Sequence, residues 1–144
     1  MKMKIEVSYQ SLLLKCPLFF ESIQYILEHF PLYKKTANHI LTQFGDEYYQ
    51  FAEKICQHLL TKVGTKEAFV RSLDSIVDYS KSYMRLQIEL IKTGKYAPQD
   101  FSEVNEATYQ NGDVMSDYLD LVFLSQIFWP NHFLTLEYFN DFCD

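Results

Sequence analysis

The chain has 144 residues, of which 48% are apolar, so we expect one folded domain with a hydrophobic core and not a disordered segment. Thirteen Lys and Arg residues against nineteen Asp and Glu give a net charge of −6, and the basic residues form no cluster of the kind that nucleic-acid binding requires. The three cysteines, Cys16, Cys56 and Cys143, are widely spaced, and with the four histidines they complete no zinc-binding pattern.

The sequence contains neither a secretory signal nor an apolar run long enough to cross a bilayer. The Met1–Lys4 start is followed by a short mixed segment before Pro17 and not by the apolar core of a signal sequence. The longest apolar-rich run, Tyr118–Trp129, is interrupted by polar residues and is shorter than the ~20 apolar residues that a membrane helix needs. We therefore expect a cytoplasmic protein with reduced cysteines and no membrane span.

Apolar residues recur at intervals of three and four along most of the chain, which predicts helices. Residues 5–14 favour a short N-terminal helix over a strand. Pro31 ends one helix and can start the next, and the turn-rich segment 95–100 is expected to connect two helices. The other helices are predicted, in chain order, at Pro17–Phe30, Leu32–Phe44, Asp46–Val63, Thr65–Thr93, Ser102–Tyr109, Val114–Trp129 and Pro130–Phe142.

The four glycines fall at the ends of the predicted helices, and none is expected within a helix. Gly45 and Gly64 stand where a left-handed C-terminal residue is favoured, Gly94 closes the longest helix, and Gly112 marks a break after Asn111. Side chains that can cap the N-termini of helices are predicted at Asp46, Thr65, Ser102 and Asp113.

Two helices carry more apolar surface than one contact face requires. In the longest helix, Leu86 and Leu90 add a second apolar edge, so neighbours on two sides are expected. Beyond Leu121, the helix at Val114–Trp129 is apolar around nearly its whole circumference, which is typical of a buried helix. The sequence therefore predicts a single all-α domain over residues 1–144, a bundle of about six to seven helices with one long central helix and a Pro-kinked C-terminal helix pair.

No catalytic motif is recognisable, since the sequence lacks a Gly-rich phosphate loop, a GxSxG turn and an HExxH pair. Asp117 and Asp120 share a helix face, but without a histidine or a third carboxylate they are best interpreted as a solvated polar edge. His132, in a Trp-Pro-Asn-His corner at a helix start, either turns the chain or lies at the rim of a ligand pocket. Tyr118 likewise either packs against its neighbours or offers its hydroxyl to a ligand.

The run VMSDYLDLVFLSQIFWPNHFLTLEYFNDF, residues 114–142, resembles the helical segment that precedes the cofactor-binding domain in a group of bacterial class I S-adenosylmethionine-dependent methyltransferases. A Trp-Pro-Asn-His corner between a Tyr- and Leu-rich helix and an aromatic helix carries the resemblance. The preceding residues 65–113 are similar to the linker helices of that family, whereas residues 1–64 show no such similarity.

The resemblance implies an accessory helical domain that covers the cofactor and the small-molecule acceptor pocket and that often carries subunit contacts. The family holds its methyl donor with a Gly-rich turn and an acidic residue of a Rossmann-like domain, which is expected beyond Asp144 and is not in this sequence. The chain alone is therefore expected to bind no cofactor and to have no catalytic activity, with S-adenosylmethionine as the cofactor of the full-length enzyme. Tyr118, Trp129 and His132 correspond to positions near the pocket or the cofactor.

Two other functions fit the same residues. Aromatic residues make up 17% of the chain, and aromatic rings on helix faces form interfaces as well as cores. In the first, the chain is a stand-alone interaction module that forms a homodimer through its aromatic helix faces. In the second, it binds a small apolar ligand in a cavity between helices.

Overall fold

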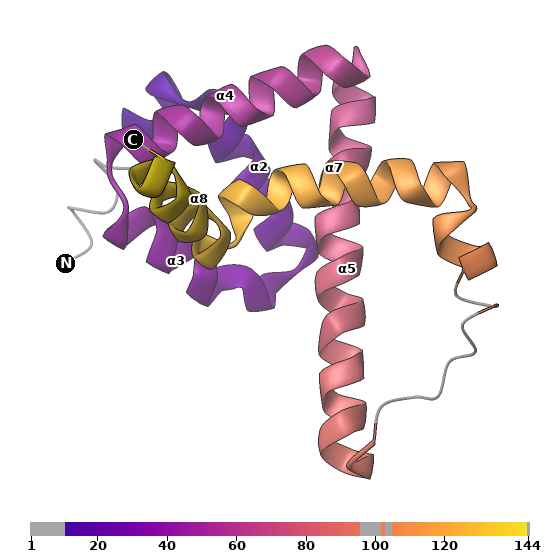
Figure 1. Ribbon diagram of the computed structural model, residues 1–144. Helices are drawn as coiled ribbons and strands as arrows, with labels where there is room; N and C mark the ends of the chain where they lie inside the picture. Colours follow the sequence, from indigo (N-terminus) through magenta and orange to yellow (C-terminus); the bar gives the residue numbers. More distant parts are fainter. Residues whose placement is uncertain (1–10, 96–101, 103–104, 144) are drawn as a thin grey trace.

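The computed structural model describes residues 11–95, 102 and 105–143, and this part of the chain is helical without any strand, which confirms the all-α prediction (Figure 1). Residues 11–15 form a helical turn before the first complete helix. Most of the predicted segment 5–14 and the connector over residues 96–101 lie outside the described residues. The elements are α2 (Pro17–His29), the 3-10 helix η1 (Pro31–Tyr33), α3 (Lys34–Gln43), α4 (Asp46–Val63), α5 (Lys66–Thr93), the π-helical turn η2 (Asn105–Tyr109), α7 (Gly112–Phe128) and α8 (Pro130–Cys143).

The core lies where α2, α4, the first half of α5 and the second half of α7 meet. The Phe19 ring of α2 stacks on Phe128 of α7 at 6.1 Å between ring centroids and meets Tyr48 of α4 edge-on at 5.9 Å. Each such buried side chain contributes roughly 1.5–3 kcal/mol through removal from water. The largest fully buried apolar side chains are Phe19, Ile23, Ile26, Ile40, Leu59, Ile76, Leu124, Ile127 and Phe128.

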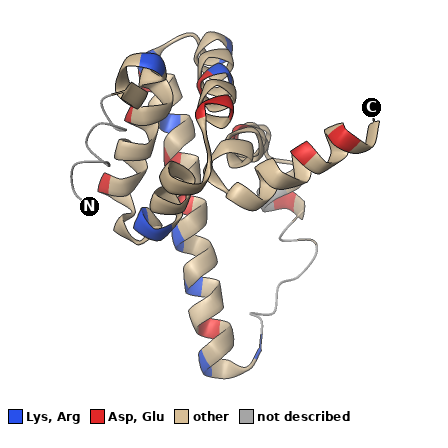
Figure 2. Cartoon of the chain, turned by 90° about the vertical axis from the view of Figure 1, so that its left-hand side faces the viewer, with Lys and Arg blue, Asp and Glu red and all other residues tan. Residues whose placement is uncertain are grey.

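The long helix α5 is packed over its first half only. That half contacts α2, α4 and α7 and buries Phe69, Leu73 and Ile76, so it has neighbours on more than one side, as predicted. From Asp78 onward α5 buries no residue, and Figures 1 and 2 show this half projecting from the rest of the molecule. At Leu86 and Leu90, the predicted second apolar edge, the side chains are 46% exposed and half-buried respectively, so neither belongs to the core.

Helix α7 is likewise buried over one half. Its second half buries Leu121, Leu124 and Ile127 between α4 and α5, but Val114 and Tyr118 of its first half are exposed. The prediction that this helix is covered all round is therefore correct only for its C-terminal part. Figure 1 gives the reason: α7 crosses α5, and its first half lies beyond the crossing, away from α2 and α4.

Local sequence signals set several helix ends as predicted. Thr65 is the N-cap of α5, and its hydroxyl oxygen accepts a hydrogen bond from the Ala68 amide at 3.1 Å. Gly64 and Gly94 end α4 and α5 in the left-handed conformation, with φ of 82° and 68°, which a residue without Cβ adopts at no steric cost.

Other boundaries differ from the prediction by one or two residues. Gly45 has an extended backbone and is the N-cap of α4, so Asp46 is the first helical residue and not the cap. At α7 the cap is Asn111, whose Oδ1 accepts from the amides of Asp113 and Val114 at 3.2 Å. Gly112 therefore lies within the first turn of α7, because the Asn111 side chain caps the helix two positions before the predicted aspartate.

Two further predicted helices are divided or altered. The helix expected from Leu32 begins as the 3-10 turn η1 and becomes α-helical only at Lys34. The helix predicted over 102–109 is described at Ser102, which is helical, and over Asn105–Tyr109, which forms a π-helical turn. Neither change alters the all-α architecture.

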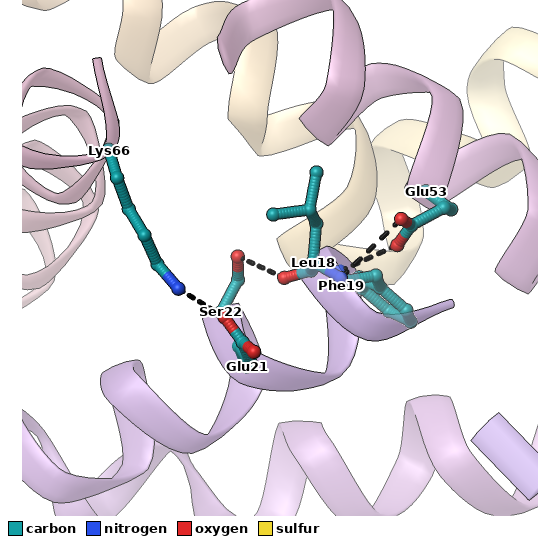
Figure 3. A network of polar contacts seen from close by, with 6 residues as sticks. All are labelled: Leu18, Phe19, Glu21, Ser22, Glu53 and Lys66. Atoms are coloured by element: carbon teal, nitrogen blue, oxygen red, sulfur yellow. Dashed lines mark hydrogen bonds and ion pairs between the residues drawn. The ribbon is translucent and has the colours of Figure 1, made fainter. Parts of the chain in front are cut away.

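A carboxylate from α4 caps the start of α2 (Figure 3). Glu53 is 5% exposed, and its two oxygens accept from the backbone amides of Phe19 at 2.9 Å and Leu18 at 3.4 Å. Gln57, one turn further along α4, donates to the same carboxylate at 3.2 Å. This capping interaction joins α2 to α4 through Phe19 and Glu53, which are more than thirty residues apart in the sequence.

Within the described residues, no helix is both long and apolar enough to span a membrane.

Candidate functional site

The Trp-Pro-Asn-His corner joins α7 to α8 at the end of the core. α7 ends at Phe128, Trp129 adopts an extended conformation, and Pro130 begins α8, as predicted. The proline ring disfavours helical geometry at the preceding residue and needs no amide partner as the first residue of a new helix. The corner is closed by hydrogen bonds from the Trp129 amide to the Ser125 carbonyl at 3.1 Å and from the His132 amide to the Trp129 carbonyl at 2.9 Å.

Two buried tyrosines fix the end of α7 from the other side. The Tyr33 hydroxyl of η1 donates to the Phe128 carbonyl at 2.7 Å, and the Tyr48 hydroxyl of α4 donates to the Ile127 carbonyl. These carbonyls belong to the last turn of α7, where no further helical amide is present to bond them. Burial raises the pKa of both phenols, which keeps them protonated as donors.

His132 is held in one orientation at the start of α8. Its Nδ1 lies 2.8 Å from the Ser125 hydroxyl, which itself donates to the Val122 carbonyl at 2.6 Å. Because the serine hydrogen is used on Val122, the serine oxygen can accept from Nδ1–H, and in that tautomer Nε2 is left as a hydrogen-bond acceptor. The Trp129 ring meets the imidazole edge-on at 5.2 Å.

An aromatic groove lies between this corner, the middle of α5 and the η1–α3 segment. Its volume is about 670 Å³, and its walls are largely apolar with a few hydroxyl, amide and imidazole groups. Tyr79 of α5 packs against Trp129 at 5.5 Å and is followed one turn later by Tyr83, whose ring is nearly parallel to it. We call this the aromatic groove, lined by Phe30, Leu32, Tyr33, Thr36, Tyr79, Ser80, Tyr83, Met84, Trp129, Asn131 and His132.

The groove brings together two of the three residues that the sequence marks as pocket-proximal. Trp129 and His132 line it, whereas Tyr118 lies in the exposed first half of α7 and is not among the lining residues. The sequence did not single out Tyr79 and Tyr83 as site residues. Their spacing of four places both rings on one face of α5, and this pair of tyrosines one turn apart is the sequence signal that could have found them.

Asp117 and Asp120 do not form a shared polar edge. Asp117 is exposed, but Asp120 is buried and forms an ion pair with Lys62 of α4 at 2.6 Å. The Ser72 hydroxyl of α5 donates to the other oxygen of Asp120 at 2.9 Å. Asp120 therefore connects three helices, because packing places partners from α4 and α5 against it.

Among the residues that the structure describes, no group of three or more His, Cys, Asp or Glu side chains could hold a metal ion. Burial raises the pKa of the Cys16 and Cys56 thiols, which keeps both protonated and disfavours them as metal ligands. Comparison with protein-family models, with curated proteins and with solved structures gave no match.

Proposed function

We propose that the chain is a helical ligand-binding domain whose aromatic groove holds a small, planar, largely apolar molecule. The observation that carries this proposal is the convergence of Trp129, Tyr79 and Tyr83 on one groove from segments far apart in the sequence. The groove volume of about 670 Å³ lies within the range of roughly 300–1,000 Å³ that is common for small-molecule sites.

The chemistry of the walls favours a flat ring over a flexible aliphatic chain. Indole and phenol faces attract other rings in offset or edge-on arrangements worth roughly 0.5–1.5 kcal/mol beyond the buried area. The hydroxyls of Thr36 and Ser80 can donate or accept hydrogen bonds, and Nε2 of His132 can accept one in the tautomer whose Nδ1–H faces Ser125. A planar molecule with one polar edge matches this combination.

An accessory domain of an S-adenosylmethionine-dependent methyltransferase is the second candidate. It is favoured by Trp129, Asn131 and His132, three residues of the resembling corner that line the groove, and the bound molecule would then be the methyl acceptor. None of the described residues that line the groove is acidic, so the lining offers no carboxylate for a sugar hydroxyl of the methyl donor. S-adenosylmethionine is therefore expected to bind the chain weakly or not at all.

The test uses Trp129 as its reporter, because it is the only tryptophan of the chain and lies in the groove. Planar aromatic molecules without a polar group, with a hydroxyl and with a carboxylate are titrated by calorimetry and by tryptophan fluorescence, together with aliphatic molecules of equal size. We expect stoichiometric binding of planar members with a change in Trp129 emission, and weaker binding of the aliphatic ones.

Tyr83→Ala removes one wall of the groove and is expected to weaken binding by about two- to tenfold, because it removes one ring contact. Tyr138→Ala is the matched control, since Tyr138 is also an exposed tyrosine but lies on α8 outside the groove. Equal affinities of the two variants, or no response from any member of the panel, would contradict the proposal. Tight binding of S-adenosylmethionine would instead identify the groove as a cofactor site.

A further inference from the structure

Charge is distributed unevenly along the chain. All thirteen Lys and Arg residues lie at or before Lys95, and every Asp, Glu, Lys or Arg that follows is acidic. In the structure this asymmetry falls on two projecting segments, the half of α5 after Asp78 and α8 (Figure 2). We call the α5 residues 79–93 the distal half of α5.

Helix α8 presents an apolar stripe with a carboxylate row beside it. Leu134, Tyr138 and Phe142 repeat every four residues and share one side of the helix, and the two aromatic side chains are 68% and 78% exposed. Glu137 and Asp141, also four residues apart, run along one flank of this stripe. Phe133 is the only buried residue among those described in α8, so the stripe is not used in the core.

The distal half of α5 presents the complementary pattern. Met84, Ile88 and Ile91 form an apolar stripe, and Ile91 is 81% exposed. Three basic residues at helical spacing, Lys81, Arg85 and Lys92, lie along one flank of it, against a single carboxylate at Glu89.

We propose that two copies of this chain associate by packing the α8 stripe of each copy on the distal half of α5 of the other. Apolar stripes of similar length then cover one another, and Glu137 and Asp141 of one copy face the basic row of its partner. Opposite charges along the rim of an apolar contact fix its register and disfavour other partners. Both halves of the contact occur on the same chain, so a second copy satisfies each of them without any other protein.

The two contacts related by a two-fold axis provide enough area for a stable pair. The two exposed aromatic rings of the α8 stripe, at roughly 150–250 Å² each, together with Leu134 and the opposing α5 stripe bury on the order of 1,000 Å² over the two contacts. A closed, reciprocal arrangement is the commonest symmetry of soluble oligomers. The α8 stripe lies outside the aromatic groove, and of the α5 stripe only Met84 also lines it, so the pairing and the groove share a single residue.

Charge reversal in two variants gives a test with its own internal control. Variant one carries Glu137→Lys and Asp141→Lys, and variant two carries Lys81→Glu and Arg85→Glu. Each alone places like charges in both contacts, so we expect its self-association, measured by sedimentation velocity over a concentration series, to weaken by about tenfold or more. Mixing the two variants restores opposite charges in both contacts, and we expect a one-to-one pair with nearly native affinity.

Glu28→Lys and Lys54→Glu change exposed charges elsewhere and are expected to leave association unchanged. Circular dichroism of each variant checks that the helices remain folded. A native chain that stays monomeric at all concentrations would overturn the proposal, as would a native dimer that both charge-reversed variants still form. A mixture of the two variants that does not associate would also overturn it.

Discussion

Glu53 supplies from a distance the N-terminal cap that α2 lacks in its own sequence. Cys16, at the N-cap position, makes no side-chain hydrogen bond to the first turn. The amides of Leu18 and Phe19 therefore depend on a carboxylate of α4, which is buried with them. One side chain thus satisfies helix-end donors and attaches α4 to α2.

Glu53→Ala is expected to lower the free energy of unfolding by about 2 kcal/mol, because the buried amide of Phe19 and the part-buried amide of Leu18 lose their acceptor. Glu53→Gln keeps one acceptor oxygen in the same place and is expected to cost about half as much. Urea denaturation followed by circular dichroism measures both. Glu28→Ala, at an exposed position, is the control, and an alanine variant at position 53 as stable as the native chain would show that the cap contributes nothing.

The sequence identifies those residues whose partners are local. Thr65 and Gly64 could be predicted because a cap bonds within four residues and a left-handed end needs only the absence of Cβ. Glu53 and Asp120 could not, because their partners belong to other helices and become neighbours only after packing. A polar residue in an amphipathic pattern looks the same whether water or a distant amide bonds it.

At the scale of the element, the C-terminal end of α7 is supported from two directions. Pro130 prevents α7 from continuing, which leaves the carbonyls of Ile127 and Phe128 without helical amides. Tyr33 and Tyr48 bond them from separate elements. The position of Trp129, and with it one wall of the aromatic groove, therefore depends on two phenol hydroxyls buried in the core.

Tyr33→Phe and Tyr48→Phe are each expected to reduce stability by about 1 kcal/mol, because each removes a single hydroxyl and leaves a buried carbonyl unbonded. Thermal unfolding of the two single variants measures this loss. Tyr109→Phe makes the same chemical change at an exposed site outside the proposed contacts and is expected to have no effect. A loss of stability in all three variants alike would argue against a specific role of the α7 carbonyls.

Helix existence follows from sequence more securely than helix limits or exposure. The spacing of apolar residues predicts every complete α-helix from α2 to α8. At Gly45–Asp46 and at Asn111–Asp113, however, two residues close in sequence can each cap the helix, and in both cases the cap is the earlier residue and not the predicted aspartate. Apolar spacing also cannot tell a covered face from an uncovered one. Val114 and Ile91 fit an amphipathic pattern, yet both lie on helix halves that extend beyond their neighbours.

At the scale of the whole molecule, the corner wall of the groove can be predicted from the sequence, whereas the wall formed by α5 cannot. Trp129 and His132 are three residues apart, and the proline between them indicates a corner directly. Tyr79 and Tyr83 reach that corner only because α5 packs on α7. Predicting the complete groove would require the relative placement of helices, which side-chain patterns within a single helix do not contain.

Global stability is expected to fall at high pH. Burial raises the pKa of Cys56 from 9.0 to about 12 and that of Tyr33 above its ordinary value. Above pH 9 the unfolded thiol loses a proton that the folded thiol keeps, so the unfolded state binds fewer protons and is favoured as pH rises. The contribution of Cys56 is therefore complete below pH 9 and declines between pH 9 and 12, by roughly 1 kcal/mol per pH unit. Tyr33 adds to the loss only above its ordinary pKa of 10.0.

Denaturant unfolding at a series of pH values, with reductant present, measures this slope. Cys56→Ala removes the buried thiol, so its slope between pH 9 and 12 is expected to be shallower than that of the native chain. Cys143→Ala removes an exposed thiol and should leave the slope unchanged. A native slope that both variants share would exclude Cys56 as a source of the alkaline loss.

Helix α5 is continuous and about 40 Å long, but the free energy needed to open it differs between its two halves. Opening its first half exposes Phe69 and Ile76 and so costs nearly as much as unfolding the whole core. Tyr79 of the distal half still packs on Trp129, but beyond Met84 no described residue of α5 is buried or lines the groove. There the helix relies mainly on local propensity and the Gly94 cap, a combination that is marginal for a short helical segment in water. Local opening therefore begins at Gly94 and stops near Val77, where the buried side chains begin.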